Sequence, residues 1–282
     1  MLAQRAARHP KITYALIVLL LVTLISGIIG GWQALLKAEE HQSKARLQIE
    51  TSAIANQLQI RFELQAQALQ RLGLRWASHY DDPATWQLDV HSLLDGFDNF
   101  QAIEWLDRQY RMRWIEPLAG NEEVIDFVYT SAHPNYSLLE QVRTTGAPLL
   151  SNSFELLQGG PGLAYYVPLY RTAGDPSSFD GFLLGIFRVE VLLGDLLRED
   201  RNYQLSVEFR EEGKLLFSHQ AADTLRQSWK VSSPVQLGEN DDFYITAMPT
   251  ASLLASTTTQ LPLLILISGV LASLSLCYAL WL

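Results

Sequence analysis

Two long stretches without a charged side chain constrain this chain more than any other feature. Residues 12–36 and residues 243–282 contain no Asp, Glu, Lys or Arg. Within them, 13–32 and 260–282 are runs of roughly twenty apolar or small residues, the length that a helix needs to cross ~30 Å of hydrocarbon. We therefore expect two transmembrane helices, which excludes a simple cytosolic enzyme.

A cleaved signal peptide is the rival interpretation of the first run, because Arg5, Arg8 and Lys11 precede it. However, the run is longer than the ~7–15 apolar residues typical of a signal peptide, and no convincing cleavage site of small residues follows it. The sequence therefore favours a helix that stays in the membrane.

The charges that flank the runs predict their orientation. Residues 231–259 contain no Lys or Arg, and basic residues are depleted on translocated flanks. We expect residues 33–259 to lie outside the inner (plasma) membrane, in the periplasm or extracellular space, and residues 1–12 to be cytoplasmic. The chain stops at Leu282, at the predicted membrane exit, so we also expect a cytoplasmic output domain that this chain lacks.

Charge and cysteine usage exclude two further classes of protein. The net charge is −9, and three of the 21 basic residues lie in the first eleven positions, so the rest of the chain is more acidic still. This argues against nucleic acid as a partner, because phosphates need Lys and Arg. The single cysteine, Cys277, lies in the second apolar run, which rules out an intramolecular disulfide and a cysteine-rich metal site.

A long helix is predicted directly after the first span. Residues 33–80 contain no Pro, and one face of a helix collects Leu47, Ile54, Leu58, Phe62, Gln65, Leu69, Leu72 and Trp76. Two roles remain open for this apolar stripe, and each can hold for a different half of the helix. It can form a stalk that pairs with a second copy of the chain to give a homodimer, or it can cover its own domain.

The region 81–200 is predicted to be an α+β domain. Asp81, Asp82 and Pro83 form the start signal of a helix over 83–95, and period-two alternation then predicts a hairpin over 102–116. The remaining signals predict helices at 135–145 and 191–199 and strands at 149–156, 163–170 and 182–190. Together these give a five-stranded antiparallel sheet with helices.

A smaller, membrane-proximal β unit is predicted for 201–259. Two hairpins, 203–219 and 228–248, each contain a Gly at the turn. Four short strands alone are marginally stable, so this unit is expected to pack on the first domain.

The residues do not predict a catalytic, metal or cofactor site. The six histidines form no HExxH and no pair at metal-ligand spacing, no GxSxG is present, and Gly159–Gly162 lacks the Lys-Ser/Thr of a phosphate loop. A metal at His79 beside Asp81 and Asp82 is disfavoured, since capping explains the aspartates. His133, just before Pro134, is interpreted as an exposed loop residue.

A small-molecule pocket is better supported. We predict that it lies on a face of the 101–190 sheet and includes Trp105, Trp114, Tyr166 and Arg188, because aromatic rings with a few convergent polar groups are typical of such sites. The Arg188 guanidinium offers a rigid donor fork to an anionic group.

A structural role for the same residues remains open. Arg188 can instead pair with Glu104, Glu116 or Glu190, because a buried guanidinium needs an acceptor. The aromatic side chains are then ordinary core.

Several short motifs, in this order and between two spans, resemble the CHASE family of extracellular sensor domains. The residues that carry the resemblance are Phe100–Asp107, Arg113–Pro117, the Gly159-Gly160 turn, Val167–Tyr170, Asp180–Phe187 and Val191–Leu197. The resemblance implies a helical stalk, a distal PAS-like module that binds a small molecule, and a smaller membrane-proximal PAS-like module. It assigns no particular ligand-binding residue.

The function predicted is the sensory input region of a transmembrane receptor. A histidine kinase of a two-component system is the first choice of output, and a diguanylate cyclase or phosphodiesterase the second, both from the resemblance. The competing hypotheses are a membrane-anchored scaffold and a membrane-tethered periplasmic hydrolase, and the latter has no nucleophile–base arrangement to support it.

Overall fold

The computed structural model describes residues 10–79, 82–97, 99–156, 159–199, 205–221, 229–250, 253 and 260–281. The predictions made for Arg5, Arg8, Asp81 and most of 251–259 lie outside these residues. The chain forms two compact units, one from residues 1–47 and 251–282 and the other from residues 48–250.

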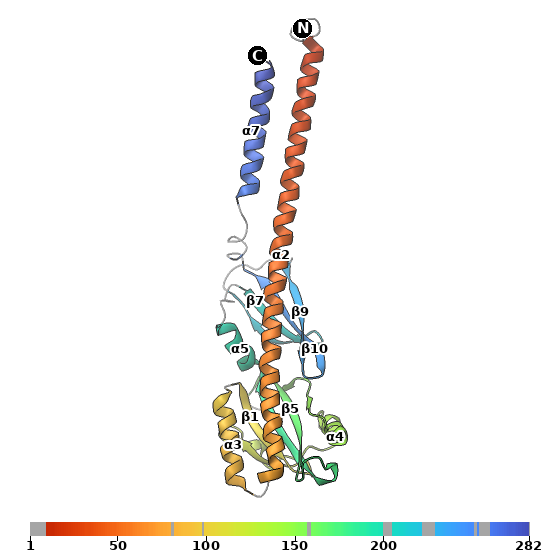
Figure 1. Ribbon diagram of the computed structural model, residues 1–282, viewed down its shortest axis with the longest axis vertical. Coiled ribbons are helices and arrows are strands. Elements are labelled where there is room, and N and C mark those ends of the chain that lie inside the picture. Colours follow the sequence, from red (N-terminus) through yellow and green to blue (C-terminus); the bar gives the residue numbers. More distant parts are fainter. Residues whose placement is uncertain are drawn as a thin grey trace. The chain divides into compact units, whose positions relative to one another are not determined.

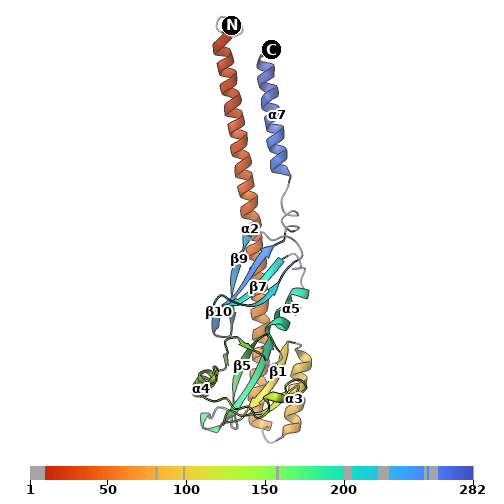
Figure 2. The same cartoon turned by 180° about the vertical axis from the view of Figure 1, so that it is seen from behind.

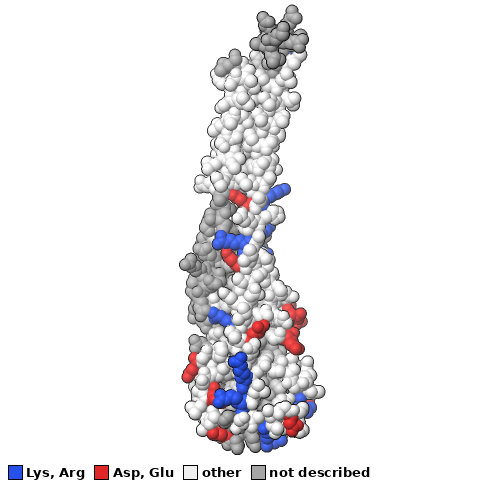
Figure 3. Space-filling model, viewed as in Figure 1, with Lys and Arg blue, Asp and Glu red and all other residues white. Residues whose placement is uncertain are grey.

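The first unit contains the two apolar runs. Helix α2 (Pro10–His79) supplies its N-terminal part, and helix α7 (Leu261–Trp281) is the second element. Both are long and apolar enough to cross a bilayer, and Figure 3 shows a wide band of this unit without charged side chains. Gly269 of α7 lies against Ile28 of α2, since a Cβ built on it would be 3.2 Å from the Ile28 side chain.

The second unit contains a six-stranded antiparallel sheet. Its strands are β1 (Phe100–Leu106), β2 (Met112–Glu116), β3 (Leu149–Leu150), β4 (Phe154–Glu155), β5 (Pro161–Tyr170) and β6 (Phe179–Arg188). The order is β2-β1-β6-β5-β3, with β4 also on β5. One row of opposed residues crosses the sheet through Ile115, Glu104, Leu184 and Tyr166, so these side chains share a face.

The prediction of five strands was wrong by one, because the segment 149–156 forms two strands. Ser151 still pairs with Ala164, but Ser153 turns away from β5 and donates its backbone N–H to Glu211 of a different sheet, at 2.9 Å. A polar partner outside the sheet thus interrupts the strand, and β4 then rejoins β5.

Two helices of this unit begin and end within one residue of their predicted bounds, and a third begins two residues earlier than predicted. Helix α3 (Pro83–Gly96) has Asp82 as its N-cap, with a carboxylate oxygen accepting from the Thr85 N–H. Helix α4 (Tyr136–Thr145) ends at Gly146, whose φ of 69° is the left-handed cap conformation. Helix α5 (Val189–Glu199) follows β6, and two short 3₁₀ turns, η1 and η2, cover Glu122–Val124 and Pro176–Ser178.

The smaller β unit is a second, four-stranded antiparallel sheet. Its strands are β7 (Leu205–Glu211), β8 (Lys214–His219), β9 (Val231–Leu237) and β10 (Asn240–Pro249), in the order β8-β7-β10-β9. Glu212 and Gly213, with φ of 44° and 88°, make the tight turn between β7 and β8.

From Ile54 to Trp76 the apolar stripe of α2 packs inside its own domain, which is one of the two roles left open by the sequence. The Phe62 ring lies 5.7 Å edge-on from Tyr165 and 5.5 Å from Phe187, and Trp76 donates its indole N–H to Asp180 at 3.1 Å. The buried stripe residues from Ile54 to Trp76 are therefore unavailable to a second copy.

The six-stranded sheet is covered on both faces. Figure 1 shows α2 crossing one face, and Figure 2 shows α4 on the opposite one. We call the second of these the α4 face. Its buried core includes Leu106, Met112, Leu139, Val142, Tyr166, Phe182 and Leu184.

Candidate ligand-binding site

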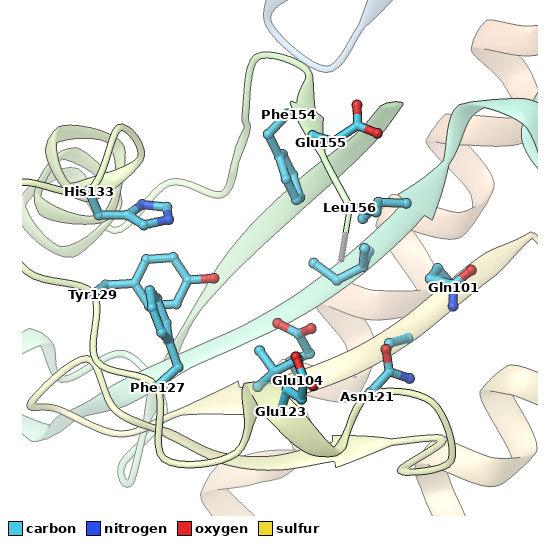
Figure 4. Close-up of a pocket in the computed structure, with 13 residues that line it drawn as sticks. Gln101, Glu104, Asn121, Glu123, Phe127, Tyr129, His133, Phe154, Glu155 and Leu156 are labelled. Atoms are coloured by element: carbon cyan, nitrogen blue, oxygen red, sulfur yellow. The ribbon is translucent and has the colours of Figure 1, made fainter. Parts of the chain in front are cut away.

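A cavity of about 300 Å³ opens on the α4 face of the six-stranded sheet. Its floor is formed by β1 and β6, and its walls by the 121–133 segment and by residues 154–156. The side chains that line it are Gln101, Ala102, Glu104, Asn121, Glu123, Val124, Phe127, Tyr129, His133, Phe154, Glu155, Leu156 and Ile186. Figure 4 shows most of them directed toward one common space.

Glu104 is the unusual residue of this lining. It stands in the middle of β1, opposite Leu184 and Ile115, and only 6% of it is exposed. Among the described residues, no cationic side chain forms an ion pair with it. Burial raises the pKa of its carboxyl group from 4.5 to about 8, because removal from water disfavours the charged form.

Two tyrosines extend the polar part of the site. The Tyr166 hydroxyl accepts a hydrogen bond from the Asn135 side-chain amide at 3.1 Å. Burial, and the proximity of Tyr166 and Glu104, raise the pKa of Tyr129, and burial likewise raises the pKa of Tyr166. Both hydroxyl groups therefore keep their protons at physiological pH and can act as donors.

His133 was expected to be an exposed loop residue, and this expectation was wrong. It is half-buried and packs against Tyr129, with ring centroids 4.4 Å apart, while its Nδ1 accepts from the Asn135 N–H at 3.1 Å. Burial lowers its pKa, so the ring is neutral at physiological pH.

The four pocket residues predicted from the sequence do not converge. Trp105 and Trp114 oppose each other across β1 and β2, on the face that α2 covers, and Trp105 lies 4.9 Å from Trp76. Tyr166 and Arg188 are on the α4 face by strand alternation, but neither lines the cavity. Tyr166 adjoins it through Tyr129, and Arg188 lies opposite Gly162, one row beyond Ile186.

The sequence carried one signal that identifies the site. In β1, FQAIEWL, the acidic Glu104 alternates with Ala102 and Leu106 on a single face. A carboxylate between two apolar residues of a central strand indicates a buried polar function. The aromatic walls gave no such signal, because Phe127 and Tyr129 lie in a segment for which no helix or strand was predicted. Phe154 lies in the predicted strand 149–156, but nothing in that strand marked it as a pocket residue.

We predict that replacing Glu104 with Gln makes stability less dependent on pH. The folded protein holds the Glu104 proton up to pH about 8, whereas the unfolded chain loses it near 4.5. Stability of the unchanged protein therefore falls as pH rises through this window. The thermal midpoint of Glu104→Gln, measured against the unchanged protein, should rise progressively from acid to mildly alkaline pH. A difference that stays constant over this range contradicts the burial argument.

A second groove, of about 220 Å³, lies between α2 and the end of β5 and contains Gly73, Val167 and Tyr170. Among the described residues that line it there is no charged side chain, so it offers less specificity for a polar ligand. The described residues also contain no group of three His, Cys, Asp or Glu side chains that could hold a metal ion.

The fold and cavity define a class: an α+β domain with two antiparallel sheets and a polar pocket, in a chain with two helices apolar enough to span a membrane. The CHASE domain model matches residues 60–223. This is more than half of the sequence, and the chain therefore belongs to the CHASE domain family.

Solved structures share this fold at low sequence identity. The extracellular domain of vpHK1S-Z8, described as a histidine kinase, aligns over 79% of this chain and 98% of its own, with 11% identity and a TM-score of 0.57. The ligand-binding domain of the Pseudomonas aeruginosa PAO1 amino acid chemoreceptor PctB, in complex with L-Arg, aligns over 78% and 100%, with 13% identity and a TM-score of 0.55.

An extracellular ligand-binding receptor from Desulfohalobium retbaense DSM5692 is similar over 71% of this chain, with 13% identity and a TM-score of 0.53, and this chain spans only 39% of that protein. At such identities these likenesses establish the fold alone. The comparison with curated proteins found no match.

Proposed function

We propose that this chain is the extracytoplasmic ligand-sensing input region of a transmembrane receptor. In this proposal 13–32 and 260–282 span the inner membrane, 33–80 is a helical stalk, 81–200 is the PAS-like sensor domain, and 201–259 is the membrane-proximal subdomain. The observation that carries the proposal is the cavity on the α4 face, which holds the buried carboxyl group of Glu104 without an ionic partner among the described residues. Buried ionisable groups with a shifted pKa in a cavity are typical of functional sites.

The fold neighbours support a ligand-binding role. Their structures contain GABA, L-Gln, L-Arg, L-isoleucine or L-leucine, so domains of this architecture take small molecules. For the output, we propose a histidine kinase, in keeping with the two neighbours described as histidine kinases. A diguanylate cyclase or phosphodiesterase is the alternative output, and a membrane-anchored scaffold is the alternative to a receptor.

The segment 151–156 supports a route from the cavity to the second sheet. Phe154, Glu155 and Leu156 line the cavity, while the preceding residue, Ser153, is held by Glu211 of β7. Both the backbone N–H and the hydroxyl of Ser153 donate to the Glu211 carboxylate, and the Lys214 ammonium donates to the Ser153 hydroxyl at 3.1 Å. A shift of the cavity wall would therefore reach β7 and its neighbour β10, which precedes the second span in sequence.

We predict that Glu211→Gln weakens signalling without preventing ligand binding. Glutamine keeps the shape but replaces charge-assisted hydrogen bonds by neutral ones of about half the strength. Output activity in the membrane-embedded receptor should become less responsive, while the ligand-induced rise in thermal midpoint is retained. Glu212→Gln, at the exposed neighbouring position, is the matched control, and an equal loss in both variants counts against the route.

We also propose a homodimer, formed through a face of α2 other than the buried stripe. Ile49, Ile60, Leu64 and Leu74 are each more than half exposed, and at 100° per residue they fall within one narrow arc of the helix. The exposed Gln67 and Arg71 lie in the same arc, and exposed apolar side chains grouped in this way are typical of a surface that pairs with another helix.

Disulfide cross-linking in membranes tests this dimer. Single cysteines at Ile49, Ile60 and Leu64, in a Cys277→Ala background, should cross-link two copies. Tyr244→Cys is the control. The neighbouring residue Ile245 is paired with Ser233, which contacts α2, so by strand alternation Tyr244 points away from α2. Cross-links that form at Tyr244 as readily as on α2 would contradict the proposed interface.

The sensor function itself is tested by ligand-induced stabilisation of the full chain in lipid nanodiscs. A metabolite collection of all charge classes should contain compounds that raise the thermal midpoint. Val124→Trp, which places a large side chain in the cavity wall, should abolish the rise, whereas Ala173→Trp, in the second groove, should preserve it. Stabilisation that survives Val124→Trp would locate the site elsewhere.

A further inference from the structure

The ionisable side chains of the cavity are predominantly acidic. Three carboxylate side chains belong to its described lining, Glu104, Glu123 and Glu155, and the described lining contains no Lys or Arg. Glu155 uses one oxygen to accept the Gly160 N–H at 2.6 Å, and Glu123 is exposed. Glu104 differs from both, since it is buried at the floor and directed into the cavity (Figure 4).

Aromatic rings surround the same space. Phe127 and Tyr129 lie 5.2 Å apart, with an angle of 82° between their planes, and Phe154 stands on the other wall (Figure 4). The faces of aromatic rings carry partial negative charge and attract an organic cation, while their area also accommodates an apolar body. The acidic side chains and the aromatic rings thus favour the same kind of ligand, an organic cation with an apolar part.

A ligand carboxylate finds no cationic partner among the described residues that line this cavity. The neutral donors of the described lining are Gln101, Asn121 and the Tyr129 hydroxyl, and the imidazole of His133 is uncharged. Arg188 is the basic residue on this face of β6, but it lies one row beyond Ile186 and outside the lining. A carboxylate placed here would face three acidic side chains.

We propose that the cavity binds a small organic cation without a carboxylate, an alkyl or aryl amine or a quaternary ammonium ion, with its charged nitrogen at Glu104 and its apolar part between Phe127, Tyr129 and Phe154. This inference rests on the proposed sensor function and names its class of ligand. It separates this chain from the fold neighbours that hold amino acids, because the described lining offers no cationic side chain to a ligand carboxylate.

The state of Glu104 gives the proposal a distinctive pH dependence. The carboxyl group is largely protonated below its pKa of about 8, so a cation must displace that proton in order to bind. Affinity for a permanently charged cation should therefore fall by about tenfold for each pH unit below 8. Binding at neutral pH should also release close to one proton, which calorimetry in buffers of different ionisation enthalpy detects.

The experiment uses the full chain in nanodiscs and sets of probes that share an apolar part and differ in whether they carry a cationic nitrogen, a carboxylate or both. Isoamylamine, L-leucine and 4-methylpentanoate form one set, and phenethylamine, L-phenylalanine and 3-phenylpropionate form a second. Choline and glycine betaine form the third. We expect at least one of the three cations to bind, with release of a proton, and its carboxylate-bearing counterparts to bind about tenfold more weakly or not at all.

Glu104→Gln should lower the affinity for the cation by about tenfold or more and should abolish the release of a proton on binding. We expect this variant to fold, since the neutral amide resembles the protonated carboxyl group of the ligand-free protein. Binding by none of the three cations overturns the inference, as does equal binding of an amine and its amino acid. Carboxylate or amino acid binding that Val124→Trp abolishes overturns the ligand class but leaves the sensor function standing. If no compound of the metabolite collection raised the thermal midpoint, both the ligand class and the sensor function would be overturned.

Discussion

Gly181→Ala is expected to lower the thermal midpoint of the protein by roughly 10 °C or more. A Cβ at this position would lie 2.0 Å from the carbonyl oxygen of Leu106, and the φ of +123° is one that side-chain-bearing residues avoid. The clash joins the new Cβ atom to a backbone oxygen, so no side-chain rotation can relieve it. The strands β1 and β6 must separate at this point, at a cost on the order of 4 kcal/mol.

Gly120→Ala is the matched control for this prediction. Gly120 also has a positive φ, +83°, but a Cβ built there has no neighbour within 4 Å. Only the conformational cost of about 1 kcal/mol remains, so the midpoint should move by a few degrees. Similar shifts for the two variants would mean that β1 and β6 are not as close as described.

Phe62→Ala is expected to cost about 3–5 kcal/mol. The Phe62 side chain is fully buried between α2 and the six-stranded sheet, where it contacts the rings of Tyr165 and Phe187. Removal of the ring leaves a cavity that rigid sheet residues cannot fill. The thermal midpoint should fall by roughly 10 °C, and the loss should be visible in the near-ultraviolet circular dichroism of the aromatic core.

Ile60→Ala, two residues earlier on the same helix, serves as the control. Ile60 is 56% exposed within one copy, so its truncation should change the stability of the monomer by about 0.5 kcal/mol or less. If Ile60→Ala proved the more damaging variant, the opposite face of α2 would be the one packed on the sheet. That result would also revive the buried stripe as a surface for a second copy.

Local patterns were sufficient for most of the secondary structure. The Asp82-Pro83 start of α3 and the Gly146 end of α4 are chemical signals confined to a few residues, and both were predicted from the sequence. Alternation likewise placed Tyr166 and Arg188 on one face of the sheet. The exception is the interruption of the predicted strand 149–156 at Ser153. It results from a hydrogen bond to Glu211, 58 positions away in the sequence, which no local pattern encodes.

The candidate site was harder to predict, because alternation defines two faces of a sheet but not which one a helix covers. Trp105 and Tyr166 are both aromatic residues on central strands, yet α2 covers Trp105 and leaves the cavity on the other side. The long-range packing of α2 decides this. His133 and Phe154 reach the site from segments whose path depends on the finished fold, so their roles follow only from the three-dimensional structure.

The central claim is that a ligand at Glu104 alters the relation between the two predicted spans. The most direct test is a cysteine pair at Ile28 and Gly269, which lie in contact, in a Cys277→Ala background in membranes. Saturation with the cation that binds most tightly should change the rate of disulfide formation between them, and Glu104→Gln should abolish the change. The account is contradicted if that cation binds, with Glu104 required, and the disulfide forms at the same rate with and without it.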